Sequence, residues 1–136
     1  MEELNQQEIK LLELAKQAAQ KAYAPYSGYK VGAALRCTDG QIFTGCNVEN
    51  ASYSLTICAE RNAIFAAVAA GYRSYSLIAV YVDSEVEFPP CGACRQVIHE
   101  FGSQIAVIYA NRHNISKTNI KALLPGAFAL ETEPNA

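Results

Sequence analysis

The sequence predicts a layered α/β fold, and three observations support this fold class. In some segments apolar residues recur at three- and four-residue intervals, which is typical of amphipathic helices. In others they alternate with polar residues or run continuously, which is typical of strands. The two kinds of segment follow one another along a chain of 136 residues, which is long enough for one domain with its own core.

The first expected element is an amphipathic helix over residues 3–23. Its apolar side chains, Ile9 among them, recur every three or four positions and form a stripe that can cover a neighbouring layer. Proline inside a helix removes a hydrogen bond and clashes with the preceding turn. We therefore expect Pro25 to stop this helix.

Two strands are expected after the helix. In residues 31–37 apolar side chains alternate with smaller or polar ones, and residues 41–46 return as a second strand. Asp39-Gly40 between them is typical of a two-residue hairpin turn. The sheet is predicted to begin here.

A loop and a second helix follow. Residues 47–56 are polar and aromatic without a sustained period, as in a loop. Residues 58–70 are rich in alanine on almost every face, and Gly71 provides a helix stop. Small side chains permit close approach, so this helix is predicted to be buried between the sheet and other helices or subunits.

The remaining elements continue the alternation of strands and helices. Pro89-Pro90 and Pro125-Gly126 are strong breaks in this part of the chain. The predicted elements are, in order, a strand, a helix, a strand and a short helix: residues 77–82, 91–101, 105–109 and 119–124.

Charge and composition exclude some partners and favour others. The formal net charge is −2 and the 11 basic residues are scattered, whereas binding to a nucleic-acid backbone needs a concentrated positive footprint. Hydrophobic residues make up 51% of the chain, which is apolar for a small monomer and favours subunit interfaces. Glu2 and Glu3 stand where a secretory signal would be positive, and the longest apolar run, residues 63–70, is too short to span a bilayer. We expect a cytoplasmic protein without a membrane partner.

The five cysteines are of two kinds. In a reducing compartment, cysteines act as metal ligands or small apolar residues more often than they form disulfides. Cys37 and Cys46 have no carboxylate, histidine or second cysteine at ligand spacing, so we expect them to be core residues. The other three are candidate metal ligands: Cys58, Cys91 and Cys94.

These three cysteines stand in two motifs, Cys58-Ala59-Glu60 and the Pro-Cys-x-x-Cys segment 90–94. Three thiolate ligands leave a tetrahedral zinc ion one open position, at which water becomes reactive. The spacing matches the signature of zinc nucleobase deaminases, in which a glutamate follows the first ligand by two residues. We therefore predict a catalytic Zn²⁺ site.

Glu60 is the predicted catalytic residue. Residues two positions apart in a regular helix point in different directions, so Cys58 must lie at the helix cap if both face one cavity. Partial burial would then raise the pKa of Glu60, which would carry a proton from the activated water to a ring nitrogen and later to the departing amine. A first-turn glutamate that only complements the helix dipole is the alternative, which the complete motif disfavours.

Arg61 is predicted to adjust the charge of the site. Three thiolates outweigh the two positive charges of zinc, which opposes ionisation of the bound water. Arg61 follows Cys58 by three residues, lies on the same helical face and can hydrogen-bond a ligand sulfur. The alternative is a solvated helix charge, which a buried alanine-rich helix disfavours.

Five segments, in the same order, make the chain resemble the small homotetrameric cytidine deaminases whose zinc ligands are all cysteines. The segments are residues 26–34, 45–51, 58–63, 90–97 and 123–128. The resemblance implies a single three-layer α/β/α domain over residues 1–136, with a mixed sheet of about five strands. It also implies hydrolysis of cytidine and 2′-deoxycytidine to the uracil nucleosides and ammonia, one Zn²⁺ per subunit, a role in pyrimidine salvage, and a homotetramer.

The resemblance further implies substrate contacts within one subunit. Asn47 and Glu49 would bind the ribose 3′-hydroxyl, and the backbone of Ala59 would lie near the base. Ala51 would be another substrate-binding residue. Tyr29 would be an aromatic wall, at a position where this family usually has phenylalanine, and its hydroxyl would need a partner if buried.

Two more aromatic residues are implied to act between subunits. Tyr53 and Phe128 would reach the substrate site of a neighbouring subunit, which requires an oligomer. The alternatives are a buried loop anchor for Tyr53 and packing of Phe128 on its own subunit.

Other functions fit parts of the pattern. A structural-zinc binding module would usually have four protein ligands, and neither His99 nor His113 stands at ligand spacing. A deaminase of a related aminopyrimidine nucleoside antibiotic would share the fold and the motif, although the pair Asn47 and Glu49 favours a ribose. A thiol-redox protein would be metal-free, with a reducible Cys91–Cys94 bridge. A polynucleotide deaminase would need a basic groove, for which this sequence gives no sign.

Overall fold

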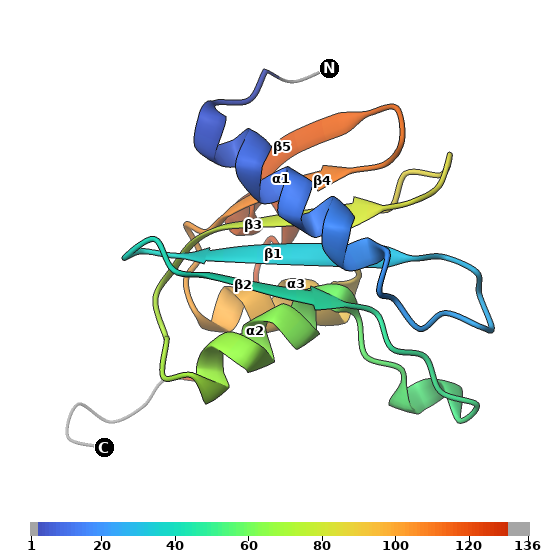
Figure 1. Ribbon diagram of the computed structural model, residues 1–136. Helices are drawn as coiled ribbons and strands as arrows, with labels where there is room; N and C mark the ends of the chain where they lie inside the picture. Colours follow the sequence, from blue (N-terminus) through green and yellow to red (C-terminus); the bar gives the residue numbers. More distant parts are fainter. Residues whose placement is uncertain (1–2, 131–136) are drawn as a thin grey trace.

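The computed structural model describes residues 3–130, which contain one five-stranded mixed sheet (Figure 1). The strands are β1 (Val31–Cys37), β2 (Ile42–Cys46), β3 (Tyr75–Val82), β4 (Ala106–Ala110) and β5 (Ile115–Asn119). They lie in the order β2-β1-β3-β4-β5. β3 and β4 run parallel, and the other neighbouring pairs are antiparallel.

Helices cover both faces of this sheet. They are α1 (Gln6–Ala19), α2 (Ala59–Ala69), α3 (Gly92–Glu100) and α4 (Ile120–Leu123), with a 3₁₀ turn at Tyr53–Leu55. α1 lies across one face, and α2 and α3 lie on the other (Figure 1). Within the described residues no helix combines the length and hydropathy that crossing a membrane requires.

Two apolar clusters hold the layers together. Leu11 and Ala15 of α1 pack with Ala34 on one face of the sheet. Ala33 belongs to the second cluster, with Ile64 of α2. Neighbouring residues of β1 thus point to opposite layers, as the pleat of a strand requires. The predicted three-layer α/β/α class with about five strands is confirmed.

Two glycines let helices approach the sheet closely. A Cβ atom at Gly32 would lie 2.0 Å from the carbonyl oxygen of Ala15 in α1. A Cβ atom at Gly45 would lie 2.5 Å from the nitrogen of Ala63 and 2.7 Å from the oxygen of Ala59, at the start of α2. Packed backbones do not tolerate such contacts. Gly45 on β2 is therefore needed to seat the first turn of α2.

α1 is shorter than the predicted helix. It begins with a capping box, in which the Glu8 amide donates to the Asn5 side chain and the Asn5 amide donates to the Glu8 carboxylate, both at 2.9 Å. It ends at Ala19, because the chain around Tyr23 pairs with the segment that follows β2. The prediction that Ile9 faces the core is wrong, since its side chain is 43% exposed and that of Glu8 is buried.

Glu8 also joins α1 to β5. Its Oε2 lies 2.7 Å from Nζ of Lys117, which is partly exposed. Burial alone would raise the pKa of Glu8, but hydrogen bonds from Lys117 and from the Asn5 backbone outweigh burial and hold this pKa below its ordinary value. The buried Glu8 carboxylate thus has one partner at the start of its own helix, Asn5, and one on β5, Lys117.

The turn between β1 and β2 is longer than the two-residue hairpin that Asp39-Gly40 predicts. The Cys37 amide donates to the carbonyl of Gln41 at 2.8 Å, which leaves residues 38–40 between the paired positions. Gly40 has φ +97°, a left-handed conformation that favours glycine and often ends a three-residue hairpin loop. The sequence located the turn correctly, but not its length.

β3 and β5 also differ from the predicted elements. β3 begins at Tyr75, two residues before the predicted start. β5 corresponds to none of the predicted strand segments, because its sequence Ile-Ser-Lys-Thr-Asn is largely polar. Such an edge strand is defined by its antiparallel pairing with β4 and not by a hydrophobic pattern.

α2 is buried on one face within this chain. Ile64 is 1% exposed, whereas Phe65 is 48% exposed and its neighbours Ala66 and Ala69 are exposed as well. The prediction of burial on nearly every face therefore does not hold inside a single chain. Burial of the outer face by another subunit stays a prediction.

Candidate metal centre

Three cysteines meet where two helices begin. Cys58 is the N-cap of α2 and Cys91 the N-cap of α3, both with extended backbone. Cys94 lies in the first turn of α3. The three Sγ atoms lie within 4.8 Å of one another, and those of Cys58 and Cys91 are 3.8 Å apart. Cys58 therefore has the cap position that the sequence analysis required.

The local sequence explains why the thiols converge. Pro89-Pro90 favours an extended chain before α3, and Nε of Arg95 donates to the Pro90 carbonyl at 2.6 Å. Nη1 of the same arginine donates to the Leu123 carbonyl at 2.9 Å, which fixes α3 against the end of α4. Gly45 seats the start of α2 against β2 from the other side.

The ligand set fits one zinc ion. Within residues 3–130 no fourth cysteine, histidine or carboxylate belongs to the cluster, so a tetrahedral ion would keep one position open. Three thiolates this close repel one another, and a divalent cation that prefers sulfur offsets that repulsion. Cys37 is buried in the core, as predicted, and Cys46 is half-buried on β2.

Arg61 lies against the thiol cluster. Its Nη2 donates to Sγ of Cys58 at 3.3 Å. A hydrogen bond from the Cys94 thiol and the contact with Arg61 together hold the pKa of Cys58 well below its ordinary value, against the effect of burial. The pKa of Cys94 is raised by that same hydrogen bond and by burial. One thiolate thus forms readily, and full ionisation of the cluster needs a cation.

Glu60 lies beside the cluster in the first turn of α2, and its side chain is 4% exposed. Burial raises the pKa of Glu60 to about 7. The nearby Cys58 thiolate acts in the same direction, while the residue's own backbone N–H acts against it. A carboxyl group that titrates near neutrality can both accept and donate a proton.

These groups line a cavity of about 220 Å³. Its metal end is formed by Cys58, Cys91 and Glu60, and Asn47 and Glu49 provide further polar lining. The apolar lining includes Val31, Val80, Val82, Phe88 and Pro89. The cavity lies near the carboxyl end of β3, where α/β sheets commonly bind ligands.

Asn47 and Glu49 are buried and also hold the loop before β1. The Asn47 side chain accepts from the Val31 amide at 2.9 Å and donates to the Tyr29 carbonyl at 2.8 Å. The Glu49 carboxylate accepts from the amides of Tyr26 and Ser27, each at 3.0 Å, and from the Ser27 hydroxyl. Burial would raise the pKa of Glu49, but these hydrogen bonds hold it below its ordinary value.

The other residues predicted to bind substrate do not all line the cavity. The backbone position Ala59 does. Ala51 is exposed and lies outside the lining. Tyr29 lies next to the lining instead of in it, and the residue is 39% exposed. This position therefore does not bury the whole tyrosine side chain.

Tyr53 and Phe128, which the resemblance assigns to a neighbouring subunit's site, are absent from this chain's cavity lining. They are 62% and 70% exposed. The carbonyl oxygen of Phe128 accepts a hydrogen bond from Nε2 of Gln96 at 2.9 Å, which places the segment after α4 beside α3. Neither ring packs in the core of its own chain.

Phe88 is a cavity residue that the sequence analysis missed. Its ring and that of Tyr29 are 4.9 Å apart, with an angle of 89° between their planes. The nearest signal was its position three residues before the ligand candidate Cys91. The apolar lining from β3 was missed because residues 77–82 were predicted only as a strand, with no role in the site.

Comparison with known families gives one matching model over residues 5–110, described as the cytidine and deoxycytidylate deaminase zinc-binding region. A cytidine deaminase from Sporosarcina psychrophila is 50% identical over 124 residues, which cover 90% of this chain and 91% of that protein. A cytidine deaminase from Halalkalibacterium halodurans is 46% identical over 123 residues, covering 89% and 93%.

A solved structure gives the same result at the level of the fold. The crystal structure of a cytidine deaminase from Burkholderia pseudomallei superposes with a TM-score of 0.85 at 50% identity. The match covers 92% of this chain and 100% of that one. The similarity in fold therefore extends over nearly the whole chain.

Proposed function

Because the chain belongs to the zinc-binding cytidine and deoxycytidylate deaminase family, we propose that it hydrolyses cytidine and 2′-deoxycytidine to uridine and 2′-deoxyuridine. Each reaction consumes one water and releases one ammonia. One observation carries the proposal above all others: a buried glutamate with a pKa near neutrality lies beside three cysteine thiols that leave a zinc ion one free position.

Cys58, Cys91 and Cys94 would hold the zinc ion. When bound, zinc supplies Lewis-acid activation of water at neutral pH. Arg61 donates to the Cys58 sulfur and withdraws negative charge from it, which offsets the excess charge of three thiolates. This hydrogen bond keeps the Arg61 side chain directed towards the thiol cluster instead of towards solvent.

Glu60 moves the protons of the reaction. Its carboxylate accepts a proton from the attacking water and, once protonated, donates to the N3 ring nitrogen of the base. After the water oxygen has added to C4, the carboxylate takes the remaining proton of the new C4 hydroxyl and passes it to the amine. The C4–N bond then breaks as the C4 carbonyl forms, and ammonia leaves as a neutral molecule. Burial supports both roles, because it raises the pKa of Glu60 to about 7 and excludes competing solvent.

The sugar would be bound at the other polar part of the cavity. Asn47 and Glu49 line it with their side chains held in place by the loop before β1, so they are oriented before any ligand arrives. The Glu49 carboxylate retains acceptor capacity for a ribose 3′-hydroxyl. Ala59, whose backbone lies at the start of α2, would contact the base.

A homotetramer is the proposed assembly. Tyr53 and Phe128 would complete the site of a neighbouring subunit, and their exposure supports this role. The exposed ring of Phe65 on α2 supports an interface over that helix. The measurement is the mass of the purified protein by light scattering, with a tetramer expected and a monomer contradicting the assembly.

A cytoplasmic role in pyrimidine salvage is the proposed biological setting. Three thiols that must stay reduced to bind metal are suited to a reducing compartment. The product would be a uracil nucleoside, which nucleotide synthesis can reuse. Competition between cytidine and deoxycytidine for one site would support this setting.

Glu60→Gln tests the proposed function. The substitution keeps the shape of the side chain but removes its ability to accept a proton. We expect one zinc per chain as in the wild type, and ammonia release from cytidine reduced by about a hundredfold to ten-thousandfold. Loss of zinc in this variant, with turnover falling in proportion, would favour a structural metal site instead.

A further inference from the structure

We propose that Phe88 forms the aromatic wall of the substrate cavity and that Tyr29 is a positioning residue that braces Phe88 from outside. The inference rests on the proposed function, since the wall would hold the pyrimidine ring of the nucleoside. The family resemblance implies an aromatic wall at Tyr29, whereas the cavity assigns this place to a residue from the loop after β3.

The relative positions of the two rings support this assignment. Phe88 lines the cavity together with Cys58 and Glu60, and Tyr29 does not. The ring centroids are 4.9 Å apart and the planes are nearly perpendicular, at 89°. This edge-to-face arrangement is a favoured aromatic contact. Tyr29 is therefore placed to restrict the rotation of Phe88 rather than to meet the substrate itself.

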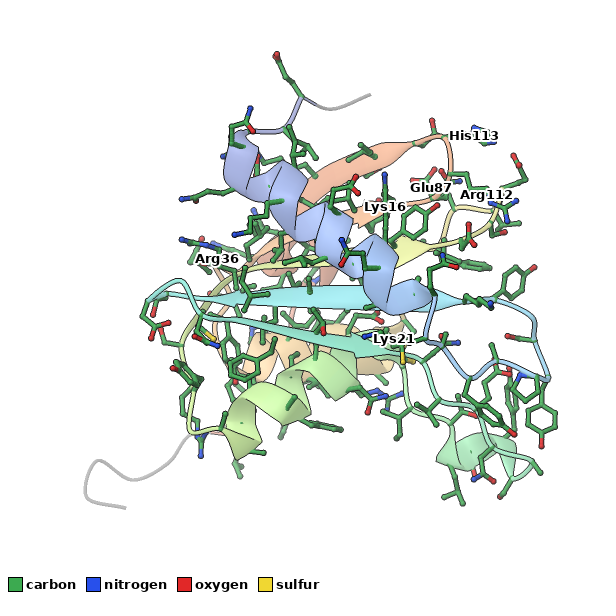
Figure 2. The ribbon with its side chains drawn as sticks, viewed as in Figure 1. Lys16, Lys21, Arg36, Glu87, Arg112 and His113 are labelled. Carbon is green, nitrogen blue, oxygen red and sulfur yellow. The ribbon has the colours of Figure 1, made fainter. Side chains whose placement is uncertain are left out.

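The chain before Phe88 is anchored to the rest of the sheet. Asn111, which is buried, donates from Nδ2 to the Glu85 carbonyl at 2.9 Å, and the Arg112 amide donates to the Ser84 carbonyl at 3.1 Å. Glu87, Arg112 and His113 gather where this loop meets the turn between β4 and β5 (Figure 2). The start of the loop is thus fixed to the end of β4.

The chain after Phe88 is anchored as well. Pro89-Pro90 limits the backbone, and the Arg95 side chain donates to the Pro90 carbonyl at 2.6 Å. The next residue is the metal-ligand candidate Cys91. Phe88 therefore lies between two fixed points, and little conformational entropy is lost when a ligand meets its ring.

The chemistry of the lining fits a flat heterocycle. Val31, Val80 and Val82 provide apolar surface around Phe88, while Glu60 stands at the metal end. A pyrimidine ring can place its face against the apolar side and its polar edge towards the carboxyl group. An aromatic ring in such a position favours offset or edge-to-face contact with the base. Phe88 would thus select for an aromatic base and hold its edge towards Glu60.

The test uses full-length, zinc-loaded protein with Phe88→Leu, Phe88→Tyr and Tyr29→Leu. We measure KM and kcat for cytidine, the competitive inhibition constant of uridine, and zinc content. Phe88→Leu should raise both KM and the uridine constant about threefold to tenfold, with kcat changed less and zinc unchanged. Phe88→Tyr, which keeps the ring, should raise them less. Val86→Ala, from an exposed position of the same loop outside the lining, should match the wild type.

A double variant separates the wall from its brace. If Tyr29 acts through Phe88, Tyr29→Leu should raise KM in the wild type but change it by less than about twofold in the Phe88→Leu background. Additive effects, or an unchanged KM in Phe88→Leu beside a raised KM in Tyr29→Leu, would overturn the assignment.

The outcome for Phe88 is distinguishable from the outcome for the proposed function. Wild-type protein that holds zinc but releases no ammonia from cytidine overturns the proposed function. If the wild type turns over cytidine normally and Phe88→Leu has the wild-type KM, only the assignment of Phe88 as the aromatic wall is overturned. If Phe88→Leu loses zinc, Phe88→Tyr becomes the test of the assignment. A rise above about threefold in the KM of Phe88→Tyr, despite its retained ring, overturns the assignment of Phe88 as the aromatic wall.

Discussion

The helices of this protein begin in two different ways. α1 starts with a capping box in which Asn5 and Glu8 bond each other's backbone amides. α2 and α3 start at Cys58 and Cys91, whose side chains cap nothing in their own helices. Their sulfur atoms turn towards one shared point instead.

This difference shows how one fold separates stability from function. The capping box of α1 satisfies two backbone amides at the start of the helix, and the helix packs on the sheet through an apolar stripe. At the starts of α2 and α3, the positive end of the helix dipole and a cysteine thiol can both interact with an ion or its ligands. Changes at the two kinds of helix start should therefore have different consequences.

The largest effect is expected from removing a thiol. Cys58→Ser should lose zinc and reduce cytidine turnover to below about a thousandth of the wild-type value, because an incomplete ligand set holds the ion weakly. Metal analysis and ammonia release measure both effects on one sample. Cys46→Ser, at a half-buried cysteine outside the cluster, is the matched control and should keep both properties. Full turnover by metal-free Cys58→Ser would contradict the account.

The two close-packed glycines offer a sharper comparison. Gly45→Ala and Gly32→Ala both press a Cβ atom onto a helix backbone, and each should lower the free energy of unfolding by about 1–3 kcal/mol. Gly45→Ala displaces the start of α2 and should also weaken zinc binding by about tenfold. Gly32→Ala acts on α1 and should leave the zinc affinity of the folded protein unchanged. Urea unfolding measures the free energy of unfolding, and competition with a chelator measures the zinc affinity. Equal zinc affinities in Gly45→Ala and Gly32→Ala would contradict the expected difference between the two helix starts.

A smaller effect is expected at the cap of α1. Glu8→Gln weakens the capping box and the ion pair with the partly exposed Lys117, so the free energy of unfolding should fall by about 1 kcal/mol. Zinc content and KM should stay at wild-type values. Glu13→Gln, which affects an exposed ion pair with Lys16, is the control and should change stability by less than about 0.5 kcal/mol. A loss of zinc in Glu8→Gln would show that the two kinds of helix start are coupled.

The smallest effect is a pH dependence at the same residue. The folded-state pKa of Glu8 lies below its unfolded value, so its contribution to stability is present above the unfolded pKa and is lost as pH falls through the folded pKa. The stability difference between wild type and Glu8→Gln should therefore shrink on acidification. Denaturant unfolding at a series of acidic pH values measures this stability difference. A difference that grows as the pH falls would contradict a folded-state pKa of Glu8 below the unfolded value.

Much of the metal site could be predicted because its residues are close in sequence. Cys58, Glu60 and Arg61 stand within one turn of helix, and two ligands share the segment 90–94. Short-range geometry then requires Cys58 to be a helix cap, and the structure has it there. The thiols, the carboxyl group and the arginine therefore follow from local chemistry.

The parts that escaped prediction depend on contacts between distant segments. β5 is polar and is defined by its pairing with β4. Phe88 lines the cavity, and the loop before it is held by Asn111, which lies far along the chain. Burial of Glu8 depends on Lys117, which no helical pattern could reveal. Hydrophobic periodicity describes which face of a segment is apolar, and it carries no information about such partners.

X-ray absorption at the zinc edge of the substrate-free, zinc-loaded protein measures whether the metal keeps an open coordination position. We expect three sulfur neighbours and one lighter atom, without the scattering pattern of an imidazole ring. A fourth sulfur or a histidine ligand would close the site and contradict the proposed chemistry.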